Sequence, residues 1–109
     1  MNVDYTPRRY ETLQLAATGA YRIARRAGRG LLTRYRVLRV LTDSRRRPLE
    51  PAPAPNGEAQ TVLDLWRGGL LSTSLGVDEP VAVTRFGHEQ LASWTERWRR
   101  QHRRASARS

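Results

Sequence analysis

The sequence predicts one small α+β domain in the order helix, β-hairpin, connector, helix, two short strands and helix. Three observations support this class: a chain of 109 residues, three segments with apolar residues at helical spacing, and segments that alternate apolar and polar residues. Residues 1–100 would form the domain, and residues 101–109 a basic, disordered tail. The core is expected to be thin, because a domain of this size buries only about two thirds of its unfolded surface.

The first helix is predicted over residues 7–18. Thr6 is a good N-cap, Pro7 is favoured at the first helical position, and Gly19 would end the helix. Between these end signals, apolar residues recur on one face, as expected for a helix that packs on a core.

A β-hairpin is predicted over residues 20–25 and 32–41, because both segments alternate apolar and polar residues around a glycine-containing turn. The alternation slips at Leu38-Arg39, which would suit a β-bulge. The alternative is a helix over residues 31–41, where apolar residues also stand at i, i+4 and i+7.

The connector between the hairpin and the second helix covers about residues 48–56 and is rich in proline. It follows a turn at Asp43–Pro48 and should be extended and stiff. Proline excludes a helix here and allows at best an edge strand.

Two further helices follow the connector. The first is predicted over residues 58–67, with Asn56 as its N-cap and an apolar stripe made of Ala59, Val62, Leu63 and Trp66. Two short strands, at residues 70–72 and 81–84, would enclose a polar loop. The last helix would start at Thr84 and place Leu91, Trp94 and Trp98 on one face.

The net charge of +10 predicts a polyanionic partner, with nucleic acid first. All 20 basic residues are arginine, which GC-rich codon usage also favours, although codon usage does not explain the excess of basic over acidic residues. From Arg8 to Arg47 there are 12 arginines against two acidic residues, whereas the segment from Pro48 to Thr84 is mildly acidic. The positive charge should therefore lie on the first hairpin, the following turn and the C-terminal tail.

The segment from residue 58 to residue 91 resembles bacterial winged-helix regulators of the MarR and PadR kind. The resemblance rests on a helix that closes with Gly69-Leu70, a wing-like β segment, and a Thr-x-x-Gly-x-x-x-Leu turn formed by Thr84, Gly87 and Leu91. It implies a winged-helix-like fold and a transcriptional regulator that binds double-stranded DNA, with a helix in the major groove and a homodimer as the common assembly.

Two features depart from the pattern of these regulators. The family's second helix has no clear counterpart, and the helix expected to read DNA carries Glu58 and Asp64 against only Arg67. Phosphate contacts should therefore come from elsewhere. The candidate phosphate-binding residues are Arg22, Arg25, Arg26, Arg29, Arg34, Arg36, Arg45, Arg46 and Arg47, and the candidates for base contacts are Gln60, Thr61 and Arg67.

Two other functions compete with DNA binding. The acidic residues of helix 58–67 would suit a protein–protein adaptor on the same scaffold, since a fold does not fix a function. Tyr21 and Tyr35 on a basic hairpin would permit RNA binding by stacking. Trp94 and Trp98 form a candidate dimer or partner stripe, in which Trp94 is expected to belong to the core and Trp98 to contact a partner.

Other functional classes have no support in the sequence. There is no cysteine, no recognisable catalytic set, and no paired ligand spacing around His88 or His102, so we expect neither an enzyme, nor a metal, nor a cofactor. No apolar run approaches the length of a membrane span, and the N-terminus lacks the pattern of a signal peptide. We therefore expect a cytoplasmic protein without a membrane partner.

Overall fold

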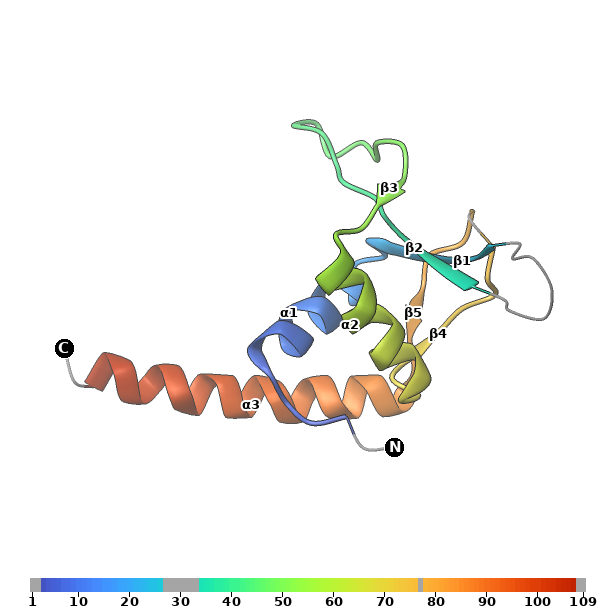
Figure 1. Ribbon diagram of the computed structural model, residues 1–109. Coiled ribbons are helices and arrows are strands. Elements are labelled where there is room, and N and C mark those ends of the chain that lie inside the picture. The colour runs from blue at the N-terminus through green and yellow to red at the C-terminus, as the bar shows by residue number, and fades with distance from the viewer. Residues whose placement is uncertain (1–2, 27–33, 77, 108–109) are drawn as a thin grey trace.

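The computed structural model describes residues 3–26, 34–76 and 78–107, with the backbone alone at residues 26, 34 and 104–107. The described chain is an α+β domain with three helices and two small antiparallel sheets, as predicted (Figure 1). In chain order the elements are α1 (Pro7–Ala17), β1 (Tyr21–Arg26), β2 (Arg34–Arg39), β3 (Ala52–Pro53), α2 (Asn56–Arg67), β4 (Leu71–Ser72), β5 (Ala82–Val83) and α3 (Arg85–Ala107).

The end signals of α1 act as the sequence indicates. The backbone N–H of Arg9 donates to the Thr6 hydroxyl at 3.1 Å, which satisfies one of the free donors of the first turn. Gly19 follows the helix with a φ of +80°, a conformation that glycine adopts without the steric penalty of a Cβ atom. The helix predicted over residues 7–18 is therefore confirmed.

The β1–β2 hairpin is also confirmed, and the alternative helix over residues 31–41 is wrong for the described part of that segment. Pairing runs without interruption from Tyr21↔Arg39 to Arg26↔Arg34, so the bulge expected at Leu38-Arg39 does not exist. The alternation slips there because Leu38 is buried on the sheet face opposite Val37, where it pairs with Pro53 of β3. The proline-rich connector thus supplies an edge strand that pairs with β2 at Leu38 and Arg39.

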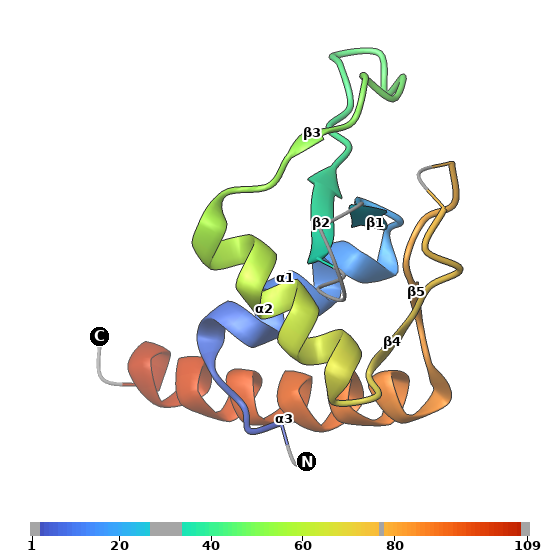
Figure 2. The same ribbon diagram turned by 45° about the vertical axis from the view of Figure 1, so that its right-hand side comes forward.

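The core lies where α1, α2 and the β1–β2 hairpin meet above α3 (Figures 1 and 2). Its largest fully buried side chains are Tyr21, Leu13, Ile23, Leu65, Leu70, Val62 and Val81, which come from every layer. The backbone N–H of Val81 donates to the carbonyl of Tyr21 at 2.9 Å, so the β4–β5 segment is joined to the free edge of β1.

The start of α3 is fixed by Thr84 and Gly87. The Thr84 hydroxyl accepts from the backbone N–H of Gly87 at 3.0 Å and donates to the Gly69 carbonyl at 2.6 Å. Gly87 lies against the Leu70 carbonyl so closely that a Cβ atom at this position would overlap it. The glycine is therefore required for α3 to approach the strand.

Two sequence predictions about helix ends are wrong. Asn56 is the first residue of α2 and makes no cap, because Pro55 occupies the cap position. Residues 101–107 are not a disordered tail but the end of α3. No glycine or proline interrupts this stretch, its arginines favour a helix, and their charge is stabilised near a helix C-terminus.

Between β2 and β3 the chain forms a projection that we call the basic arm, residues 40–51. The bridge Thr42↔Pro48 continues the β2–β3 pairing beyond Arg39↔Ala52, with two residues between these pairs on the first strand and three on the second. The extra residue makes a bulge near Glu50 and Pro51, and bulges bend a hairpin. In both views the arm stands away from the rest of the domain (Figures 1 and 2).

The contact at Gly87 gives a prediction. Gly87→Ala should lower the free energy of unfolding by about 3 kcal/mol, near the upper end of overpacking effects, because the Leu70 carbonyl cannot move without the strand. Urea unfolding measures this change. The matched control is Gly57→Ala in α2, where the added Cβ would meet only the flexible end of Arg8 at 2.9 Å. We expect the control to change stability by less than about 1 kcal/mol, and an equal loss in both variants would contradict the prediction.

Candidate nucleic-acid interface

The arginines of the β1–β2 hairpin do not form one continuous row. Arg22 is half-buried, and its guanidinium donates to the Gly19 carbonyl at 2.8 Å. Arg25 and Arg36 are exposed, but the pairing register places them on opposite faces of the sheet. The backbone positions of Arg26 and Arg34 pair with each other, whereas their side chains and all of Arg29 lie outside the described part of the structure.

The turn of the basic arm is organised by Asp43. Its carboxylate accepts from the backbone N–H groups of Arg45 and Arg47, each at 2.9 Å, and from the Arg47 side chain at 3.2 Å. The Asp43 carbonyl accepts from the N–H of Arg46, whose φ is 60°. All three arginines are exposed, so the acidic residue shapes the turn and pairs with only one of them.

The outer face of α2 offers little for reading bases. Gln60 is exposed but donates to the Asp64 carboxylate at 3.0 Å. Thr61 is 7% exposed and its hydroxyl donates to the Gly57 carbonyl, so its predicted base contact is wrong. Arg67 is exposed in the last turn, as a base or phosphate contact requires.

Glu58 does not contribute free negative charge to this face. The buried Tyr21 hydroxyl donates to its carboxylate, and the Arg39 guanidinium lies 3.3 Å away. Burial raises the pKa of Tyr21 well above its usual value, and the hydrogen bond and charge of Glu58 raise it further, while Arg39 opposes this shift. Since Tyr21 is fully buried, the stacking role that RNA binding would need from it is not available.

The tryptophan stripe of α3 divides into a buried and an exposed residue. Trp94 is 4% exposed and packs edge-on against Tyr5, so it belongs to the core and cannot contact a partner. Trp98 is 39% exposed and stacks on His102, with ring centroids 3.9 Å apart. Contact of Trp98 with a partner therefore stays a prediction.

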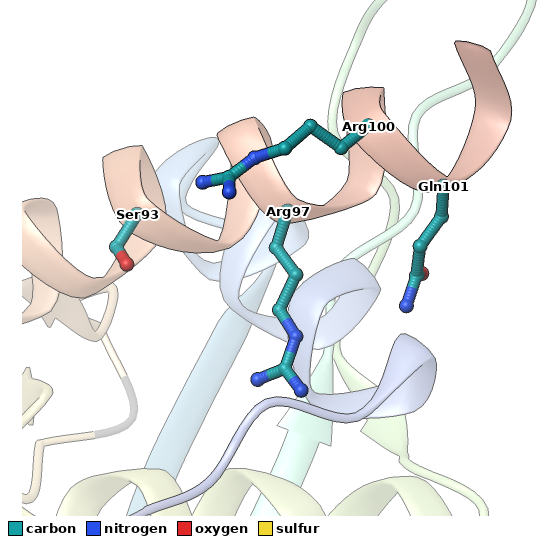
Figure 3. Close-up of a pocket in the computed structure, with 4 residues that line it drawn as sticks. All are labelled: Ser93, Arg97, Arg100 and Gln101. Carbon is teal, nitrogen blue, oxygen red and sulfur yellow. The ribbon is translucent and has the colours of Figure 1, made fainter. Parts of the chain in front are cut away.

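Two surface features of the structure are not predicted from the sequence. On α3, Arg97 and Arg100 line a shallow hollow with Ser93 and Gln101 (Figure 3). The Arg97 guanidinium also lies over the Tyr5 ring. On the basic arm, Leu41 and Leu49 are exposed by about half. Both leucines stand four residues from Arg45, and this symmetry about the turn was the available signal.

Within the described ranges, no group of three histidine, aspartate or glutamate side chains could hold a metal ion. No helix in the same ranges is both long and apolar enough to cross a membrane.

The Tyr21–Glu58 contact predicts a pH-dependent stability difference. Tyr21→Phe should lower the free energy of unfolding by about 1–2 kcal/mol at neutral pH, because Glu58 loses a buried hydrogen bond. The folded-state pKa of Tyr21 is raised above the unfolded value of about 10. Its contribution is therefore complete below about pH 10 and is lost as the pH rises further.

Urea unfolding at about pH 8 and pH 11 tests this prediction, and the gap between the two proteins should narrow at the higher pH. A gap that stays constant would contradict it. Tyr10→Phe, which loses a hydroxyl hydrogen bond to Thr95 at 3.1 Å, controls for removal of a tyrosine hydroxyl at neutral pH.

Comparison with known proteins finds no matching family model, no similar curated protein and no similar solved structure.

Proposed function

We propose that the chain binds double-stranded DNA as a transcriptional regulator, with the basic arm as its principal phosphate contact. The observation that carries the proposal is the Asp43 turn. Backbone hydrogen bonds to a single carboxylate hold the turn and leave Arg45 and Arg46 exposed, with no ion pair to any described residue. Guanidinium groups presented in this way match phosphate oxygens in charge and geometry.

The scaffold supports the same proposal through its winged-helix-like order. A helix, α2, is followed by a short β4–β5 segment that joins the edge of β1 through Val81. The last helix then begins at the Thr84–Gly87 turn. In the winged-helix proteins that the sequence resembles, such a segment stands beside the DNA-reading helix. We propose that the β1–β2 hairpin and its arm stand where those regulators have their second helix, since they precede α2 in the chain.

The division of charge also favours the arm over α2. Glu58 is paired with Arg39, and Asp64 is held by Gln60, which leaves Arg67 as the basic residue of that helix. A helix with one arginine neutralises few phosphates, and phosphate neutralisation supplies most non-specific affinity. We therefore propose that α2 contributes orientation and at most one base contact.

A salt titration tests the role of the arm. Each phosphate contact adds about 0.9 to the slope of log K against log salt, so Arg45→Gln/Arg46→Gln should reduce the slope by about 1.8. The turn should persist in this variant, because Asp43 holds the backbone N–H of residue 45 and the Arg47 side chain remains. Fluorescence anisotropy on a labelled duplex measures the slope.

The matched control is Arg85→Gln/Arg99→Gln, which removes the same charge from α3. Both of these arginines already have a carboxylate partner, at 3.7 Å and 3.6 Å respectively. We expect the control to retain the wild-type slope. An equal reduction in both variants would mean that only net charge matters, and a protein that binds no duplex at about 50 mM salt would refute DNA binding itself.

A homodimer through α3 is a second part of the proposal, since small regulators of this kind commonly bind two half-sites. The supporting observation is Trp98, a large aromatic side chain left 39% exposed on a helix that extends past α1 (Figure 1). Sedimentation of the wild type and of Trp98→Ala would show whether this residue holds two copies together.

A further inference from the structure

The basic arm carries an apolar pair that the domain does not cover. Leu41 is 52% exposed and Leu49 is 49% exposed, which makes them the most exposed large hydrophobic residues of the described chain. The backbone N–H of Leu49 donates to the carbonyl of Leu41 at 2.8 Å, so the two residues are directly opposite each other. Opposed residues of an antiparallel pair share a face, and their side chains therefore form one patch.

The arm holds this patch in a defined place. Beyond the leucines, the Thr42↔Pro48 bridge and the Asp43 turn close the hairpin through backbone hydrogen bonds. At its base, Leu41 lines a surface hollow of about 400 Å³ together with Leu15 of α1 and Pro48. A hairpin that is bonded at both ends presents its apolar pair without an ordering cost at the moment of binding.

The residues beside Leu41 and Leu49 indicate the chemistry of the partner that this apolar pair would bind. Arg45 and Arg46 follow within a few residues, so the partner must offer negative charge and apolar surface side by side. Duplex DNA does so, since its phosphates flank stacked bases whose faces become accessible when a step opens. Proteins that insert leucine or similar wedges from the minor groove unstack the step and bend the duplex.

We propose that the basic arm bends DNA, with Leu41 and Leu49 opening a base step from the minor groove while Arg45 and Arg46 hold the flanking phosphates. This inference rests on the proposed DNA binding. It adds a mechanical role to that function, and it places sequence preference in the deformability of the contacted step. Flexible pyrimidine–purine steps such as TA would be favoured, because they unstack most easily.

The test uses a duplex of about 30 base pairs with a donor and an acceptor dye at its ends and 2-aminopurine at a central TA step. Binding of the wild-type protein should raise both energy transfer and 2-aminopurine fluorescence. Leu41→Ser/Leu49→Ser should bind about tenfold more weakly, with an unchanged salt slope and without either signal. Both side chains are half exposed, so the variant should fold, and a thermal melt checks this. Phe86→Ser, which removes a 42% exposed side chain from α3, is the matched control and should behave as the wild type.

Several results would overturn the inference, and they can be told apart. Wild-type binding without either signal, or a serine variant that bends DNA as the wild type does, refutes the wedge and leaves DNA binding intact. Leucine-dependent sedimentation with vesicles of phosphatidylcholine and phosphatidylserine, together with leucine-independent DNA binding, would assign the pair to a lipid surface instead. Absence of duplex binding would refute the proposed function and the wedge together.

Discussion

A single carboxylate links α2 to both strands of the β1–β2 hairpin. Glu58, in the first turn of α2, accepts the Tyr21 hydroxyl of β1 and pairs with Arg39 at the end of β2. The chain between Arg39 and α2 contains the basic arm and a proline-rich connector, which makes few core contacts of its own. The Glu58 contact therefore adds a polar link between α2 and the base of the arm, beside the packing of Tyr35 on Trp66 and the shared core, which also hold the hairpin to this helix.

The same contact changes the electrostatic character of α2. The sequence shows two acidic residues against one basic residue on this helix, which argues against a role on DNA. In the structure the Arg39 guanidinium neutralises the Glu58 carboxylate, so the charge of Arg39 is used inside the domain. Arg45 and Arg46 on the arm have no ion pair to a described residue, and exposed arginines also lie on the body of the domain and toward the end of α3. The arm and the end of α3 thus add to the positive charge that the body of the domain already carries.

Local patterns predicted most of the fold, and tertiary contacts decided the rest. The alternation of apolar and polar residues in β1 and β2 and the end signals of α1 could be predicted, because strand period and cap chemistry are local properties. The burial of Thr61 could not be predicted from the sequence, since it depends on which face α2 turns toward the hairpin. The helical end of α3 differs from the sequence prediction because a charged, polar composition indicates disorder as well, although arginine is itself a good helix former.

The basic arm shows that residue types alone do not identify every residue of the candidate site. Arg45–Arg47 were predicted from their charge, whereas the only local sign that Leu41 and Leu49 face each other is that each stands four residues from Arg45. The β2–β3 register, continued without a bulge, does not give this pairing. A bulge-free register would pair Leu41 with Glu50 and separate the leucines. The extra residue therefore does two things at once: it bends the arm away from the sheet and it brings the two apolar side chains together beside the arginines. A solubilising turn needs neither effect, whereas a DNA-bending arm needs both.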